Sequence, residues 1–183
     1  MIKYIKNKLK KFIYNSLYSA SDDVKESIYN SLFSSALKLE QDRYRKKYDI
    51  SNEFRFNGIY IYLYGDGKII LGENSYIGDY STIQSSPACE VKVGKKCSLS
   101  HNVRIYTESI ASDQDFSEQN LVSKKGNVII EDFVWIGANV FINPGVTIGK
   151  NSIVGANSVV VRDLPPNGIY GGVPAKLIKL KSN

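Results

Sequence analysis

Few side chains in this sequence suit acid–base or nucleophilic chemistry near neutral pH, and His101 is the first of them. It is the only histidine among the 183 residues. Imidazole exchanges a proton close to operating pH, so His101 is the candidate general base. The two cysteines, Cys89 and Cys97, are too few for a disulfide framework, and we expect both to be reduced and buried.

The elements that position these residues are indicated by a strict six-residue period. A strand alternates every second residue and a helix every third or fourth, so a period of six predicts a short strand and a turn, repeated. Three such hexads make one coil of a triangular prism, whose core forms by stacking coils. The apolar leaders of successive hexads are Ile130, Ile136, Ile142, Ile148, Val154 and Val160. The fourth places, suited to left-handed turns, hold Asn139, Gly145, Asn151 and Asn157.

Earlier hexads extend the pattern towards the N-terminus and define the domains. They break at residues 85–90 and again at residues 108–128, a polar stretch longer than an ordinary connection and therefore expected to be functional or disordered. The expected organisation is a helical segment at 1–57, a β-helix at 58–164 and a C-terminal tail at 165–183. The earlier leaders are Leu71, Ile77, Ile83, Val93, Leu99 and Ile105.

The hexads also fix which residues stack. If the chain resumes in phase after residues 108–128, His101 heads a column of turn residues that continues with Ala138 and Ala156. Stacked strands are about 4.8 Å apart, so this column is a groove about 10 Å long, floored by small side chains. Cys97 occupies the inward fifth place of its hexad and Cys89 lies off register. Neither is placed as an activated thiolate, so we expect no covalent intermediate on a cysteine.

Two segments, WIGANVFINPGVTIG and PPNGIYGGVPAKLIK, carry a family resemblance. Together with the hexads they resemble the left-handed β-helix acyltransferases with hexapeptide repeats, [LIV]-[GAED]-x-x-[STAV]-x, and within them the sugar O-acetyltransferases. The resemblance covers roughly residues 69–180. It implies a left-handed parallel β-helix that acts as a homotrimer in the cytoplasm. The implied activity is transfer of an acetyl group from acetyl-CoA to a sugar hydroxyl of a surface polysaccharide, either capsule or O-antigen.

The resemblance also implies roles for single residues. The pantetheine arm would lie along the column, His101 would be the base, and the backbone N–H of Ala138 would stabilise the oxyanion. Trp135 matches the tryptophan near the acetyl and acceptor groups, and either Asp113 or Asp115 would orient the base. Basic residues near the coenzyme phosphates would be Arg162, Lys176 and Lys179.

One departure concerns the base itself. Many sugar O-acetyltransferases of this fold carry a T-x-x-H pattern, where this chain has Thr107, Glu108, Ser109 and Ile110. The segment SLSHNV around His101 instead resembles acyltransferases that act on lipid A precursors and nucleotide amino sugars. N-acetylation of an amino-sugar nucleotide therefore stays an alternative, as does a non-catalytic β-helix scaffold. A zinc site of three histidines would need three chains to converge at one point, so we expect no metal.

The N-terminal residues predict two helices. Residues 1–18 alternate apolar residues with five lysines and no acid, so they form a basic amphipathic helix that either contacts an anionic membrane surface or packs on the second helix. The second helix begins near Asp22 and runs towards Lys47, where it would cover the open edge of the first coil. No stretch approaches the roughly 18 apolar residues that cross a bilayer, and no secretory signal is expected. The net charge of +6 has no nucleic-acid motif with it, so no nucleic-acid partner is expected.

Overall fold

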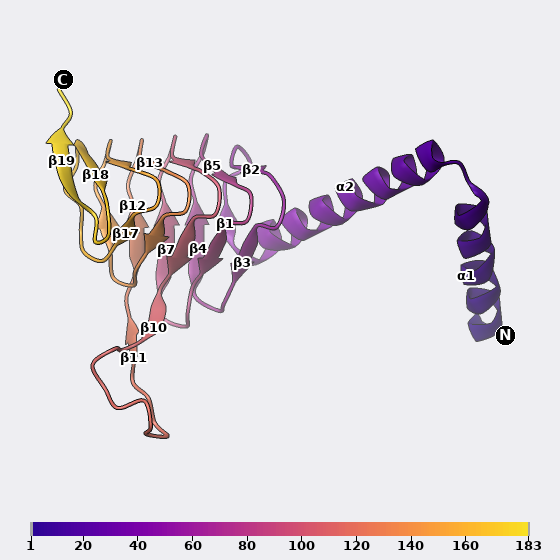
Figure 1. The fold of residues 1–183 in the computed structure, drawn as a ribbon, viewed down its shortest axis with the longest axis horizontal. Helices are drawn as coiled ribbons and strands as arrows, with labels where there is room; N and C mark the ends of the chain where they lie inside the picture. The colour runs from indigo at the N-terminus through magenta and orange to yellow at the C-terminus, as the bar shows by residue number, and fades with distance from the viewer. Residues whose placement is uncertain (1, 183) are drawn as a thin grey trace. The chain divides into compact units, whose positions relative to one another are not determined.

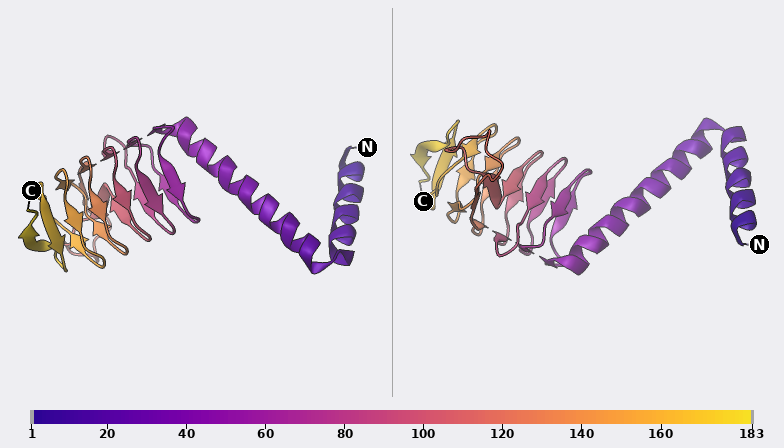
Figure 2. Two further views of the ribbon diagram at one scale, coloured as in Figure 1. Left: turned by 90° about the horizontal axis from the view of Figure 1, so that it is seen from above. Right: turned by 90° about the horizontal axis from the view of Figure 1, so that it is seen from below.

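Short parallel strands wind around one apolar core and stack into three flat sheets (Figure 1). The computed structural model describes residues 2–182, and the side chains of residues 8 and 11–182. The predicted left-handed parallel β-helix is confirmed. The two views in Figure 2 show the strands stacked side by side along the axis of the β-helix.

The three sheets are named here A, B and C, in the order in which each coil meets them. Sheet A consists of β1 (Asp49–Ile50), β4 (Lys68–Leu71), β7 (Glu90–Val93), β12 (Val128–Ile130) and β15 (Thr147–Ile148). Sheet B consists of β2 (Arg55–Asn57), β5 (Tyr76–Gly78), β8 (Ser98–Leu99), β13 (Trp135–Ile136), β16 (Ile153–Val154), β18 (Gly168–Gly171) and β19 (Lys176–Leu180). Sheet C consists of β3 (Tyr62–Tyr64), β6 (Thr82–Gln84), β9 (Arg104–Tyr106), β14 (Phe141–Ile142) and β17 (Val159–Val160). Sheets A and C therefore define coils 1 to 5.

The predicted leaders form the core. Each leader from Leu71 to Val160 is at most 1% exposed. Ile130 pairs with Val93 below it and Ile148 above it, so the chain resumes in phase after residues 108–128, as expected. Burying about one Ile or Val per strand stabilises each coil by about 1.5–3 kcal/mol per side chain, which explains why the register holds across a long interruption.

The turns between sheets use left-handed backbone at the predicted fourth places. The φ angles of Asn139, Asn151 and Asn157 are each 59° and that of Gly145 is 84°. Asn and Gly tolerate this region best, so the sequence and the backbone agree at these four turns.

The β-helix begins earlier than residue 58, the boundary expected from the sequence. β1 and β2 already belong to sheets A and B, and the chain divides into units Met1–Asp42 and Arg43–Asn183. The last residues of α2 (Asp22–Lys47) lie in the second unit, where Arg45 donates to the carbonyls of Ser51 and Phe54 at 2.6 and 2.7 Å. The end of α2 therefore caps the first coil, as expected for an open β-helix edge.

The first unit contains α1 (Ile2–Ser19) and most of α2. The side chains of Lys8, Lys11 and Phe12 are exposed, and no described side chain of α2 is buried. The other residues of the predicted basic stripe, at positions 2, 3, 5, 6, 9 and 10, lie outside the described side chains. Among residues 2–182, neither helix is long and apolar enough to cross a membrane.

Residues 108–128 and the tail are more regular than expected. β10 (Glu108–Ile110) and β11 (Ser123–Lys125) pair antiparallel, so only residues 111–122 form a loop. Beyond residue 164, β18 extends sheet B from β16, and β19 pairs antiparallel with it. The tail therefore covers the last coil rather than trailing from it (Figure 1).

Candidate active site

The predicted column of turn residues is present between sheets B and C. Leu99 pairs with Ile136 and Ile136 with Val154, which places His101, Ala138 and Ala156 in successive coils, each two residues beyond its leader. The Asn139 N–H donates to the His101 carbonyl at 3.0 Å, which fixes the stacking of these two turns.

A carboxylate from the coil below holds the imidazole of His101. Its Nδ1 lies 3.0 Å from Oδ2 of Asp79, with the two side chains 64% and 30% exposed. The other oxygen, Oδ1, accepts the backbone N–H of Ile59 at 2.7 Å. Because a carboxylate only accepts, Nδ1 carries the proton in the neutral ring and Nε2 is left as the free acceptor. An imidazole held in one orientation with a free Nε2 is suited to act as a general base.

The glycine before Asp79 makes room for this pair. A Cβ at Gly78 would lie 3.1 Å from both the Nδ1 and the backbone nitrogen of His101. These separations are tighter than most real contacts of a Cβ, so a side chain here would push the imidazole away from Asp79. Glycine at position 78 therefore leaves the space that the His101 ring needs beside Asp79.

The aspartates predicted to orient the base do not do so in this chain. Asp113 and Asp115 are exposed in the loop 111–122, and Asp115 instead accepts the N–H and hydroxyl of Ser117 at 2.9 and 2.7 Å. Those two hydrogen bonds hold the pKa of Asp115 below its ordinary value. Asp79 takes the predicted role because the coil register, rather than the loop, brings a carboxylate under Nδ1.

The turns stacked above His101 carry backbone N–H groups without a partner. Among residues 2–182, the N–H of Ala138 and that of Ala156 donate no hydrogen bond. Beside them, a ladder of amides fixes the turns, with Asn102 donating to Asn139 at 2.9 Å and Asn139 to Asn157 at 3.0 Å. A rigid turn with a free N–H can stabilise negative charge on an oxygen without reorganising.

The hexads of coils 4 and 5 match a known family. The family model described as bacterial transferase hexapeptide (six repeats) matches residues 127–162. The chain is similar to this family over those residues. The match covers the coils that carry Ala138 and Ala156, so the column above His101 is the part of the candidate site that the family model covers.

Three similar proteins bear on its chemistry. The chain is 54% identical over 52 residues to galactoside O-acetyltransferase of Escherichia coli, which is 28% of this chain and 26% of that protein. A hexapeptide-repeat acetyltransferase of Vibrio cholerae, solved with acetyl coenzyme A, has a TM-score of 0.59 at 29% identity, covering 79% of both chains. The N-acyltransferase AntD of Bacillus cereus, solved with dTDP-4-amino-4,6-dideoxyglucose and coenzyme A, has a TM-score of 0.65 at 26% identity, covering 75% of this chain and 79% of that one. The chain spans 26% to 65% of the length of the curated relatives it matches.

The other predicted site residues lie on sheet B and beyond coil 5. Trp135 is 52% exposed on the outer face of sheet B, outward as predicted, between Ser98 and Ile153 in its column. The three predicted phosphate-binding residues are exposed and lie beyond coil 5, at Arg162, Lys176 and Lys179. The roles of Trp135 and of these three basic residues stay predictions. All four side chains are exposed and therefore accessible to a ligand.

The two cysteines do not resemble nucleophiles. Cys97 is fully buried and donates to the Glu131 carbonyl at 3.0 Å. Burial raises the pKa of its thiol, which favours the unreactive protonated form. Cys89 is also buried and free of a disulfide. Within residues 2–182, no group of three His, Cys, Asp or Glu side chains could hold a metal ion.

A polar contact anchors the hairpin that follows coil 3. Glu108 accepts the hydroxyl of Ser86 and lies 3.4 Å from Lys125 on the opposite strand. The buried hydroxyl of Thr107 accepts the Ser86 N–H at 2.8 Å. The contacts with Ser86, Ser123 and Lys125 hold the pKa of Glu108 below its ordinary value. The start of the hairpin is therefore fixed to coil 2 through Ser86.

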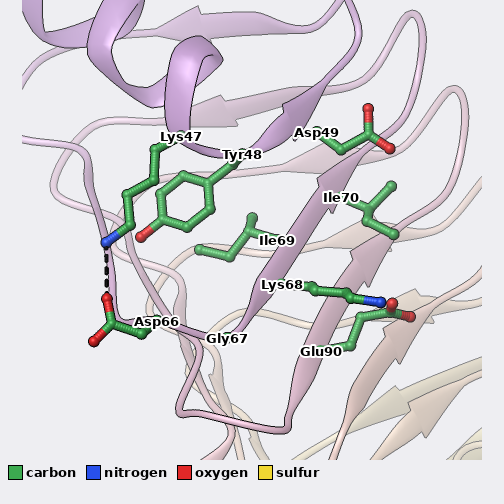
Figure 3. A pocket seen from close by; sticks show the side chains of 9 residues that line it. All are labelled: Lys47, Tyr48, Asp49, Asp66, Gly67, Lys68, Ile69, Ile70 and Glu90. Carbon is green, nitrogen blue, oxygen red and sulfur yellow. Dashed lines mark hydrogen bonds and ion pairs between the residues drawn. The ribbon is translucent and has the colours of Figure 1, made fainter.

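A hollow on the first two coils contains none of these residues. Figure 3 shows it between the end of α2 and sheet A, with Lys47 bridged to Asp66 at 3.2 Å and Lys68 beside Glu90. No residue that lines it belongs to the His101 column. The Lys47 pKa is raised by Asp66, as expected for a cation beside a carboxylate. This hollow belongs to the cap of the β-helix rather than to the candidate site.

Proposed function

We propose that this hexapeptide-repeat transferase carries an acetyl group from acetyl-CoA to a hydroxyl of a sugar in a surface polysaccharide, either capsule or O-antigen. One observation carries the proposal. An imidazole whose Nδ1 is held by Asp79 stands at the head of a groove of open backbone N–H groups, at Ala138 and Ala156. Acyl transfer needs both features, a base for the hydroxyl and a donor for the oxyanion.

The proposed reaction is direct transfer. Nε2 of His101 takes the proton of the acceptor hydroxyl as its oxygen forms a bond to the thioester carbonyl carbon. The carbonyl oxygen becomes an anion that accepts the Ala138 N–H, and Asp79 stabilises the imidazolium. When the C–S bond breaks, the sulfur leaves with the electron pair and takes the proton from Nε2. The products are an ester and a free thiol.

The residues present fit coenzyme A. The groove floor has only methyl side chains at Ala138 and Ala156, so an extended arm meets no bulky side chain there. The exposed cations Arg162, Lys176 and Lys179 stand at the end of the prism where phosphates would lie. The similar acetyltransferase solved with acetyl coenzyme A supports the same ligand.

N-acetylation of an amino-sugar nucleotide is the second candidate. The similarity to AntD, solved with an amino-sugar nucleotide, favours it, as does the turn histidine in SLSHNV. A free amine needs less help from a base than a hydroxyl does. The two reactions are distinguished by treating the product with hydroxylamine, because esters cleave and amides do not.

The test is coenzyme A release by wild type and His101→Ala, using a panel of surface-polysaccharide sugars. We expect the variant to bind acetyl-CoA as wild type does. Its turnover should be slower by about 100-fold or more. A variant with wild-type turnover would refute the base assignment. A wild type that binds no acetyl-CoA would favour the non-catalytic scaffold.

We further propose that the chain assembles as a homotrimer in the cytoplasm, with residues 1–18 touching the inner membrane surface. Outward apolar side chains at Phe141 and Val159 support assembly, and exposed Lys11 and Phe12 support membrane contact. Light scattering after gel filtration tests the trimer. Flotation with anionic and neutral vesicles, with and without residues 1–18, tests the membrane contact.

A further inference from the structure

Two tyrosines occupy turn positions that suit asparagine. In the turn between sheets B and C, coils 3 to 5 place Asn102, Asn139 and Asn157 in left-handed backbone, with φ of 54°, 59° and 59°. Coils 1 and 2 place Tyr60 and Tyr80 there instead, with φ of 55° and 59°. This backbone is unfavourable for an aromatic residue and tolerable for asparagine. The backbone therefore does not explain why both positions hold tyrosine.

The two rings stack on each other and stay partly open to solvent. Their centroids are 5.4 Å apart with an angle of 18° between the planes. Tyr60 is 45% exposed and Tyr80 is 53% exposed. Among residues 2–182, neither hydroxyl makes a hydrogen bond. Each ring therefore keeps one face that the other ring does not cover, and both hydroxyls are unused.

The Tyr60–Tyr80 pair lies next to His101 in the stack of turns. Tyr80 follows Asp79 directly, and the next residue of its column, Asn102, follows His101. The Asn102 N–H donates to the Asp79 carbonyl at 2.7 Å, and the Tyr80 N–H to the Ile59 carbonyl at 3.0 Å, which fixes the order of the stack. With about 4.8 Å between coils, the two rings span about 10 Å from the base, the length of one or two sugar rings.

The base divides the turn into two sides. The free N–H groups and methyl side chains of Ala138 and Ala156 lie towards coil 5, where coenzyme A would lie. The tyrosines lie towards coil 1. A general base must lie between the acyl donor and the hydroxyl it activates, so the acceptor belongs on the tyrosine side.

We propose that the Tyr60–Tyr80 pair is the acceptor subsite and that it binds the apolar C–H face of a pyranose ring. A tyrosine is suited to this because its ring packs on the sugar while its hydroxyl bonds to the sugar's hydroxyls. The inference rests on the proposed function, since it takes His101 as the base. It adds the residues that select a ring-shaped acceptor.

The test replaces each tyrosine with the residue that the later coils use. Tyr60→Asn and Tyr80→Asn remove the ring but keep a residue that tolerates the left-handed backbone. The matched control is Phe133→Asn, an aromatic residue with φ 61° in the turn between sheets A and B, packed by Lys96 and Lys150 at 6.0 and 5.4 Å. Phe133 lies outside the His101 column, so the control changes the same chemistry away from the site.

Coenzyme A release is measured with methyl hexopyranosides and disaccharides, and with a hexitol that has the hydroxyls but no ring. We expect the tyrosine variants to raise the KM for pyranosides about 10-fold or more, with the KM for acetyl-CoA and the thermal midpoint retained. Phe133→Asn should leave all three unchanged, and wild type should prefer pyranosides to the hexitol. An unchanged pyranoside KM in both tyrosine variants would overturn the proposal, as would an equal rise in Phe133→Asn.

Saturation-transfer NMR of sugar binding separates this inference from the proposed function. If wild type transfers acetyl groups but the tyrosine variants bind pyranosides as well as it does, the subsite is wrong and the function stands. If wild type transfers none but binds pyranosides through the tyrosines, the subsite stands and the function is wrong. If wild type neither transfers nor binds, both are refuted.

Discussion

The contact between Asp79 and His101 gives the sharpest prediction, tested by Asp79→Asn. Oδ1 of Asp79 accepts the Ile59 N–H at 2.7 Å, so the amide oxygen of the substituted side chain takes that place. Its NH₂ group then faces Nδ1 of His101. Because this group donates, Nδ1 must accept and the ring proton moves to Nε2. The base is left in the wrong tautomer with its free nitrogen turned inward.

The size of the effect follows from the charge that is lost. A carboxylate and an imidazolium about 4 Å apart attract by about 1 kcal/mol in water and about 4 kcal/mol near a protein surface. His101 is 64% exposed, so water screens the pair and the attraction is about 1 kcal/mol. Its loss lowers kcat by about 5-fold, and the wrong tautomer lowers kcat further. Binding of acetyl-CoA should not change, because Asp79 lies on the other side of the base.

The assay is steady-state coenzyme A release, with Asp132→Asn as the control. Asp132 accepts the Lys95 N–H at 3.0 Å from the preceding coil, the same backbone role that Asp79 plays for Ile59, but it faces no histidine. We expect Asp132→Asn to keep wild-type kcat. A kcat for Asp79→Asn within threefold of wild type would refute the orientation of His101, and an equal fall in both variants would show a structural effect instead.

Three further predictions concern the core, the hairpin and the thiol. Ile136→Ala empties a fully buried leader and should lower the free energy of unfolding by about 2–5 kcal/mol in urea, whereas a change below about 1 kcal/mol would contradict close packing between coils. The pKa of Glu108 is held below its ordinary 4.5, first by Ser86, so its contribution to stability is present above that value and is lost as the pH falls through the lower folded-state pKa. The protection of the β10 and β11 amides against hydrogen exchange, measured relative to an unstructured peptide at the same pH, should therefore fall in acid, and Glu108→Gln should lower it at pH 7; equal protection in both proteins at pH 7 would argue against the anchor. Because burial raises the pKa of Cys97, a disulfide reagent should label it only on unfolding, and rapid labelling of the native protein would contradict its burial.

The sequence predicted the coil register because one physical constraint repeats. Each leader must point into the core, and a shift of one residue would expose every leader in the strand. The column of His101, Ala138 and Ala156 followed from this alone. In the structure Asp79 belongs to the same column, since it stands two residues after Ile77 as His101 does after Leu99, and these two leaders pair.

The sequence does not single out Asp79, because the chain breaks at residues 85–90, between its coil and that of His101. Asp113 and Asp115 are near His101 in sequence but do not lie in the stack of coils. The hairpin in residues 108–128 was also not predicted, because its strands are three residues long and mostly polar. The hairpin is held by the contacts of Glu108 with Ser86 and Lys125. The six-residue repeat carries no information about these contacts.

The interruption at residues 108–128 is mechanically separate from the stack of coils. Strands β9 and β14 pair directly, as do β7 and β12, although the hairpin leaves the stack between coils 3 and 4. The core leaders therefore set the spacing between His101 and Ala138. A change in the length of residues 111–122 should leave that spacing intact.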